Sequence, residues 1–130
     1  MTEDPRIALV TQAVDAFNTQ DVPALLTFIH PDGVSHVSPG LANPGTWQGV
    51  EGYAKMMVDW SEAFSELHVD VKEIELVDDT HVLVHAAQTG VGAGSGAPVE
   101  LDVVFMVELA GEQAIRFEIH PDRDSAMEAV

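Results

Sequence analysis

From Leu67 onwards, apolar and polar residues alternate along four successive segments that short turns separate. The clearest segment is VELDVVFMVEL, in which every second residue from Val99 to Leu109 is apolar. Successive side chains of a β-strand point to opposite faces, so this alternation predicts strands with one buried face. Short turns join antiparallel neighbours, and the second half of the chain therefore predicts an antiparallel sheet.

The start of the chain shows helical spacing instead. Apolar residues at positions 7, 10, 14 and 17 form one stripe, which predicts a first helix capped by Thr2 or Asp4. Asp21 can cap a second short helix, and Pro31 ends it because the residue before a proline is biased away from helical dihedrals. The chain is therefore expected to begin with two helices.

The middle of the chain predicts the longest helix. Residues 34–38 form a short extended piece, and a loop rich in proline and glycine follows over residues 39–49. Large side chains then recur at helical spacing from Val50 to Phe64, and a last helix is expected after Asp122. Together with the strands, these helices predict one α+β domain over residues 1–130, with helices on one face of an antiparallel sheet.

The charge and composition exclude several classes of partner. The chain carries 22 acidic residues against 5 Lys and Arg, which gives a formal net charge of −17. Such a chain repels phosphate backbones and anionic lipid surfaces, so neither nucleic acid nor a membrane is an expected partner. The sequence has no cysteine, no apolar run long enough to span a membrane and no signal-like N-terminus. We therefore expect a soluble, cytoplasmic protein.

Several stretches resemble one protein family. The segments AFNTQDVPALLTFIHPDGV, TWQGVEGYAKMMVDWSEAFSEL and IRFEIHPDRDSAMEAV, with the order of elements, resemble the SnoaL-like branch of the nuclear transport factor 2-like superfamily across essentially the whole chain. The resemblance implies a cone-shaped domain in which a curved antiparallel sheet wraps the long helix and leaves an apolar pocket at the open end. It also implies homodimers that form through the outer face of the sheet.

Two reactions of this superfamily lack their catalytic residues here. By approximate alignment, the resemblance to ketosteroid isomerases places the base at Ser38, the donor tyrosine at Ala13 and the donor acid near Val103. None of these side chains can fill its role. The resemblance to limonene epoxide hydrolases would need a carboxylate at Ile119, and burial of its apolar neighbours turns Glu118 to the other face. Neither chemistry is expected.

His36 is the remaining candidate for proton transfer. The resemblance to polyketide cyclases asks for only one pocket acid or base, and an imidazole exchanges protons near neutral pH. Alternation places His36 on the same face as Ser38, and this face lines the pocket in the resembled fold. The competing interpretation, a half-buried histidine that hydrogen bonds to the backbone, carries more weight than catalysis.

Other polar and aromatic side chains predict the walls of a ligand pocket. Gln88 shares a strand face with apolar residues, so its amide could orient a carbonyl or hydroxyl group, unless the strand has left the core there. Tyr53 could offer a phenol, or it could pack its ring and hydrogen bond to solvent. The predicted ligand-binding residues are Ser38, Tyr53, Met57, Trp60, Gln88, Phe105 and Phe117.

The tetrapeptide Ile-His-Pro-Asp occurs twice, at residues 29–32 and 119–122. Its His and Asp side chains could bind a metal, but neither His-x-Asp pair has a spacing specific to zinc or iron, and the flanking sequences differ. Each copy also has a local role, because Pro31 ends a helix and Asp122 can cap another. We expect neither an internal repeat nor a metal site.

These observations favour a small homodimer that binds or transforms a small hydrophobic molecule without a cofactor. One hypothesis is a cyclase or isomerase that uses His36 on a polyketide-like or steroid-like substrate. The alternative is a non-catalytic ligand-binding protein that lacks the catalytic carboxylates. A third hypothesis is an interaction module, in which the outward side chains Val104 and Met106 form a self-association surface.

Overall fold

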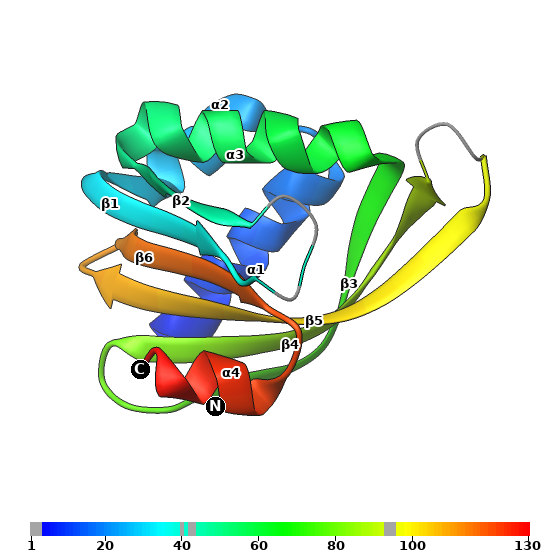
Figure 1. The fold of residues 1–130 in the computed structure, drawn as a ribbon. Coiled ribbons are helices and arrows are strands. Elements are labelled where there is room, and N and C mark those ends of the chain that lie inside the picture. Colours follow the sequence, from blue (N-terminus) through cyan, green and yellow to red (C-terminus); the bar gives the residue numbers. More distant parts are fainter. Residues whose placement is uncertain (1–3, 40, 42–43, 93–95) are drawn as a thin grey trace.

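The computed structural model describes residues 4–39, 41, 44–92 and 96–130. The elements, in chain order, are α1 (Pro5–Asn18), α2 (Val22–Phe28), β1 (Ile29–Val37), β2 (Gly45–Gln48), α3 (Gly49–Ala63), β3 (Phe64–Leu76), β4 (His81–Gly92), β5 (Pro98–Ala110), β6 (Gln113–His120) and α4 (Arg123–Glu128). Six strands form one curved sheet in the order β2-β1-β6-β5-β4-β3, and the sheet wraps around α1 and α3 (Figure 1). The predicted α+β fold is confirmed.

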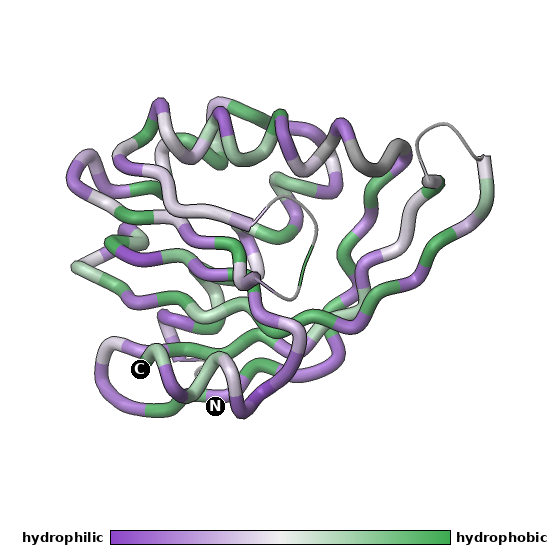
Figure 2. Tube along the Cα trace, viewed as in Figure 1, coloured by the Kyte–Doolittle hydropathy of each residue, from purple (hydrophilic) through white to green (hydrophobic). Residues whose placement is uncertain are grey.

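Hydropathy alternates along the strands (Figure 2), and successive residues of a strand face opposite sides of the sheet. Neighbouring strands pair antiparallel except β1 and β6, which run parallel. On the inner face, Val84 of β4 lies opposite Phe105 of β5, which lies opposite Ile119 of β6. Leu83 and Met106 are paired on the outer face. The register thus buries both faces of the central strands, the inner one beneath the helices.

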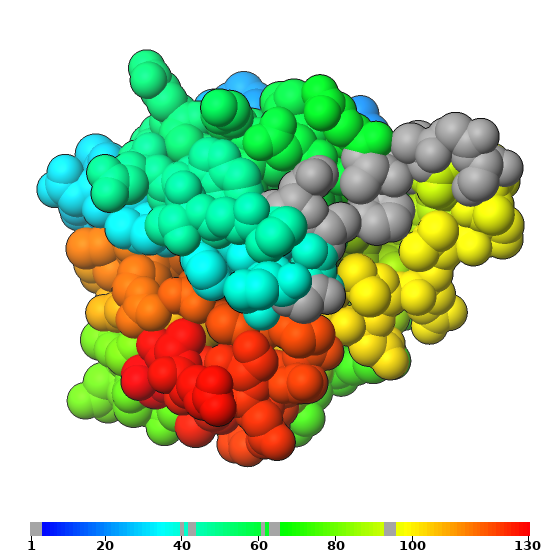
Figure 3. All heavy atoms as spheres, viewed as in Figure 1, coloured from blue at the N-terminus to red at the C-terminus, as the bar shows by residue number. Residues whose placement is uncertain are grey.

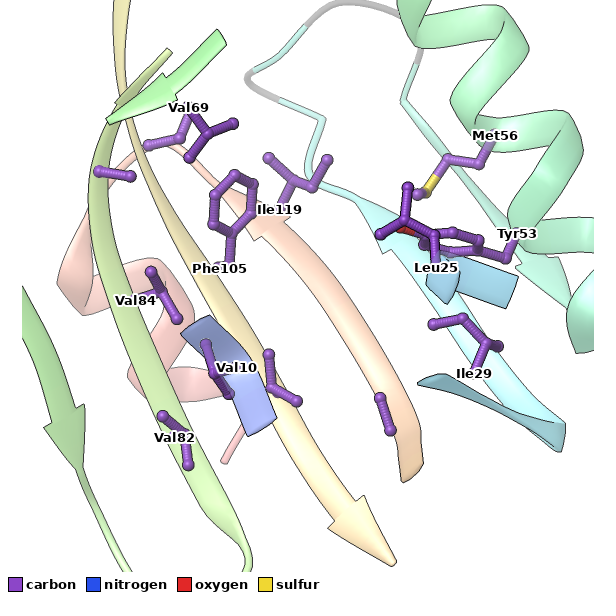
Figure 4. Packing of buried hydrophobic residues seen from close by; sticks show 14 of the residues in the cluster. Val10, Leu25, Ile29, Tyr53, Met56, Val69, Val82, Val84, Phe105 and Ile119 are labelled. Carbon is purple, nitrogen blue, oxygen red and sulfur yellow. The ribbon is translucent and has the colours of Figure 1, made fainter. Parts of the chain in front are cut away.

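Helices α1 and α2 each begin directly after an aspartate whose side chain caps the first turn. The Asp4 carboxylate accepts the backbone N–H of Arg6 at 2.9 Å, and the Asp21 carboxylate accepts a backbone N–H at the start of α2. In α3, Tyr53, Met56 and Trp60 follow helical spacing and are all buried against the sheet. Figure 4 shows Tyr53 and Met56 reaching from this helix towards the strands. No helix in the described part of the chain is long and apolar enough to cross a membrane.

Two boundaries differ from the sequence-based expectation. The second helix ends at Phe28, and a strand expected over residues 34–38 already begins at Ile29, where β1 pairs with Ala114 of β6. The predicted loop over residues 39–49 contains strand β2, which pairs with β1. Pairing of β1 with the distant strand β6, and of β2 with β1, overrides the local preference at these two places. Residues 40, 42 and 43 of that loop, and residues 93–95 between β4 and β5, lie outside the described residues.

Helix α4 covers the outer face of the sheet (Figures 1 and 3). Ala126 of α4 packs with Leu83, Val104 and Met106 in a second apolar cluster, and Met106 is 0% exposed. The expectation that Val104 and Met106 form a self-association surface is therefore wrong, because the chain's own last helix already buries them. A homodimer would have to use other residues.

An ion pair holds α4 to the edge of the sheet. Arg123 donates to the Glu75 carboxylate at 3.0 and 2.7 Å, and His85 Nε2 lies 3.1 Å from it. Hydrogen bonds from Arg123 and then His85 lower the pKa of Glu75 from 4.5 to about 2. Because the folded-state pKa is depressed, this contribution to stability is present above about pH 4.5 and is lost as the pH falls towards 2.

We therefore expect the melting temperatures of wild type and Glu75→Gln to converge as the pH is lowered from about 5 to about 2. Circular dichroism melts of both proteins across this range measure the difference. Glu112→Gln, an exposed carboxylate in the β5–β6 turn, is the matched control and should show little change. A difference between wild type and Glu75→Gln that stays constant over the range would contradict the assignment.

Candidate functional site

An apolar cavity lies between the helices and the inner face of the sheet. Its lining comprises Val10, Ala13, Val14, Phe17, Leu25, Phe28, Ile29, Tyr53, Met57, Trp60, Val69, Val84, Gln88, Phe105, Val107, Phe117 and Ile119. The space open to the centre of a water molecule is about 70 Å³. A single water needs roughly 10–15 Å³ on this measure, so the cavity has room for several water molecules or an organic group.

Aromatic rings form one side of the cavity. The Phe117 ring stacks on Phe105 with a centroid distance of 5.6 Å and meets Tyr53 edge-to-face at 5.7 Å. Such contacts fix the ring orientations, because aromatic quadrupoles favour offset and edge-to-face geometry. In Figure 4, Phe105 and Val84 project from the strands into the interior, with Tyr53 and Leu25 on the helical side. The helix α3 and the centre of the sheet thus hold a rigid apolar wall.

Two polar side chains interrupt this apolar lining. Gln88 is 4% exposed and Tyr53 is 5% exposed, and both line the cavity. Neither the Gln88 amide nor the Tyr53 hydroxyl has a hydrogen-bond partner among the described residues. The polar atoms of Gln88 and Tyr53 are not among the fully buried side-chain atoms without a partner, so they are open to the cavity and can bond to a molecule there. Burial raises the pKa of Tyr53 well above its usual range, so its hydroxyl stays protonated.

The structure brings most of the predicted ligand-binding residues together. Tyr53, Met57, Trp60, Gln88, Phe105 and Phe117 all line the cavity. Ser38 does not line it: the residue is 7% exposed, follows the end of β1, and donates its backbone N–H to the Ile119 carbonyl at 3.0 Å. The predicted residues that line the cavity therefore come from α3 and strands β4 to β6, and the residue beyond β1 is left out.

His36 was predicted to share the pocket face, and this placement is wrong. Strand β1 runs parallel to β6, and His36 lies opposite Glu118 on the outer face of the sheet. Val37, opposite Ile119, takes the inner face and is 1% exposed. Burial of Val37 fixes the alternation of the whole strand, which turns His36 away from the cavity. Nδ1 of His36 instead lies 2.9 Å from the hydroxyl oxygen of Thr46.

Next to His36, the outer face carries a polar network that ties α4 to β6. Glu118 Oε1 lies 2.7 Å from His120 Nε2, and Nδ1 of the same ring lies 2.7 Å from the Ser125 hydroxyl. Arg116 donates to the other Glu118 oxygen at 2.6 Å. The His36 and His120 rings are 6.2 Å apart. These groups lie on the opposite side of the sheet from the cavity, and the His120–Ser125 contact links β6 to α4.

The two Ile-His-Pro-Asp segments lie far apart. The first opens β1, where Ile29 is opposite Ala114 at the start of β6, and the second begins with the last two residues of β6. Because the two strands run parallel, the segments are at opposite ends of the strand pair. Asp122 accepts the backbone N–H of Ser125 at 2.8 Å and caps α4, as predicted.

Sequence reasoning missed the part of the cavity that α1, α2 and the start of β1 supply. Val10, Val14 and Phe17 belong to the predicted apolar stripe of the first helix, but that stripe alone could not show that they enclose a cavity. Ala13 also lines it, at the position where the resemblance to ketosteroid isomerases places a tyrosine. A small residue at this position leaves space where a larger ring would fill it.

Comparisons with known proteins agree with this geometry. Residues 10–117 match the family described as SnoaL-like domain. No curated protein matches the chain significantly in sequence.

Solved structures share the fold at low identity. TerC co-crystallised with polyporic acid has a TM-score of 0.81 at 20% identity, covering 96% of this chain and 97% of that one. An NTF2-like protein of unknown function from Burkholderia pseudomallei reaches 0.83 at 18% identity, covering 98% and 95%. A protein with a ketosteroid isomerase-like fold from Catenulispora acidiphila, in complex with trimethylamine, reaches 0.76 at 19% identity, covering 92% and 89%.

Proposed function

Because this chain belongs to the SnoaL-like domain family, we propose that it binds a small, mainly apolar molecule in the cavity between its helices and its sheet. One observation carries the proposal: an apolar cavity that contains two buried polar side chains, Gln88 and Tyr53, without partners among the described residues. Apolar walls supply contact area, and a few convergent polar groups orient the ligand.

The proposed ligand carries one polar group among apolar atoms. The Gln88 amide can donate and accept hydrogen bonds, and the protonated Tyr53 hydroxyl can do the same. A hydroxyl or carbonyl group of the ligand can bond to either side chain. Two of the similar folds, TerC and the Catenulispora protein, were crystallised with small organic molecules. This likeness supports a small-molecule role, and the proposed ligand chemistry rests on the cavity of this chain alone.

Binding without catalysis is the function that the cavity supports best. Among the described residues of the lining, Tyr53 is the only titratable side chain, and burial keeps it protonated. A general base that works near neutral pH needs a group that can lose its proton there. The second candidate is a cofactor-independent cyclase or isomerase in which Tyr53 and Gln88 polarise a substrate carbonyl, as hydrogen-bond donors do in an oxyanion hole. Turnover that Tyr53→Phe abolishes would favour this second candidate.

Replacing Gln88 with leucine tests the proposed orientation of the ligand. We expect the variant to bind octanol roughly two- to tenfold more weakly than wild type, because one hydrogen bond to the hydroxyl is lost. Isothermal titration calorimetry measures the affinity. Gln12→Leu makes the same change at an exposed position of α1 and should bind like wild type. Equal affinity of all three proteins would show that Gln88 does not contact the ligand.

A further inference from the structure

A groove adjoins the cavity. It lies between the C-terminal end of α1, the helices α2 and α3, and the first residues of β3. Its lining comprises Phe17, Gln20, Val22, Leu25, Leu26, Tyr53, Ala54, Met57, Val58, Glu62, Glu66 and Leu67. The space open to the centre of a water molecule is about 680 Å³, far more than in the cavity. This groove is open to solvent, since Val22 and Val58 are 52% and 58% exposed.

The groove and the cavity share part of their walls. Phe17, Leu25, Tyr53 and Met57 line both spaces. The two spaces therefore adjoin, and rotation of these shared side chains is the simplest way to join them. Tyr53, which is 5% exposed and whose hydroxyl has no partner among the described residues, is one of these shared residues.

The two ends of this combined site differ in charge. The cavity lining holds no charged side chain among the described residues, whereas the groove lining holds two carboxylates, Glu62 and Glu66, and no basic side chain. Both carboxylates are exposed and belong to a chain with a net charge of −17. Clustered charge of one sign in a concave surface raises the local concentration of the opposite ion. The groove therefore favours a cationic group and disfavours a carboxylate.

The backbone holds both rims of the groove in unusual conformations. Gln20 and Glu66 have φ angles of 60° and 53°, and they are the non-glycine residues with positive φ in the described part of the chain. Both line the groove, and Glu66 lies at an irregularity in the β3–β4 pairing, between Ser65 and His68. Left-handed conformations of such residues cost free energy and persist where the surrounding structure fixes them. The backbone thus fixes the position of Glu66 at the rim, and its side chain is exposed.

We propose that the ligand of this site is an amphiphilic amine, with its apolar body in the cavity and its ammonium group in the groove beside Glu62 and Glu66. This inference rests on the proposed function and adds the charge and orientation of the ligand. The Tyr53 oxygen can accept a hydrogen bond from the ammonium group. An apolar acid of the same length would place its carboxylate next to two like charges.

Three probes with the same apolar chain and different head groups test the proposal: octylamine, octanol and octanoate. At about pH 7.5 the amine is cationic and the acid is anionic. By calorimetry at low salt, we expect octylamine to bind at least about tenfold more tightly than octanoate, and about 0.5 M NaCl to reduce this ratio. In the double variant that carries Glu62→Gln and Glu66→Gln, we expect the octylamine-to-octanoate affinity ratio to fall at least about threefold.

A matched double variant separates the local effect of the groove from the net charge of the chain. Glu51→Gln combined with Glu112→Gln removes the same number of charges at exposed positions that line neither space, and should keep the wild-type ratio. The inference would be overturned if the octylamine-to-octanoate affinity ratio fell equally in both double variants. It would also be overturned if the wild-type protein bound octanoate as tightly as octylamine. In either case, binding of octanol would still support the proposed function. Failure of octanol itself to bind would overturn the proposed function and this inference with it.

Discussion

Replacing Trp60 with alanine is expected to lower the free energy of unfolding by roughly 3–5 kcal/mol. Trp60 is 2% exposed and is one of the largest fully buried side chains of the structure. It packs from α3 against the core on the inner face of the sheet and lines the cavity. Its removal would enlarge an existing space, so the surrounding side chains have little freedom to collapse into the void, and the cost should lie near the upper end of the range. Urea unfolding at a fixed pH measures the change.

Val58→Ala is the control for this experiment. It truncates a side chain on the same helix that is 58% exposed, and we expect a change within about 0.5 kcal/mol. A loss below about 1 kcal/mol for Trp60→Ala would show that α3 does not pack against the sheet as described, because a fully buried tryptophan cannot be removed so cheaply.

Filling the cavity should abolish ligand binding while the protein stays folded. Ala13 faces the cavity from α1, and phenylalanine at this position would place a ring in the space that the ligand needs. We expect Ala13→Phe to weaken octanol binding at least about 100-fold, because a filled interior at native packing density leaves no room for a second molecule. Calorimetry measures the affinity, and a thermal melt shows whether the variant folds.

Thr11→Phe introduces the same ring on the exposed side of the same helix and should bind octanol like wild type. The pair therefore separates occupation of the cavity from any effect of added surface hydrophobicity. Wild-type affinity in a folded Ala13→Phe protein would place the ligand elsewhere.

The sheet could be predicted from the sequence because burial of one face forces a period of two residues. In β5 and β6, Phe105, Phe117 and Ile119 face the interior, and Glu118 faces outward, as the alternation indicated. Glu118 is nevertheless buried, at 8% exposure, because α4 and the polar network cover the outer face. The pattern within a strand reports which face a residue occupies, and it carries no information about what covers that face.

The misplacement of His36 has a related cause. Strand β1 shows no clear alternation of apolar and polar residues. The predicted face of His36 therefore depends on Ser38, which lies just beyond the strand. Val37 decides the question, because it is buried against the inner core and Val37 and His36 must point to opposite faces. Strand β2 gave no signal at all, since four residues at the sheet edge are too short for a period to appear.

The cavity could be predicted only in part. Tyr53, Met57, Trp60 and Gln88 were identified from their own helix and strand, where spacing assigns a face. The contribution of α1 and α2, and the groove with Glu62 and Glu66, depend on how distant elements pack. No local pattern encodes a space between helices that are not adjacent in sequence. The charge difference between cavity and groove therefore emerges only from the folded structure.

Methyl-resolved NMR during a titration with octanol tests the central claim most directly, because the sheet supplies its own internal control. Val84, Val107 and Ile119 line the cavity. Leu83 and Val104 lie in the cluster beneath α4 on the outer face. We predict saturable shifts of the first set of methyl resonances and little change in the second. Shifts confined to the outer-face methyls, or no saturable shift in either set, would contradict binding in the cavity.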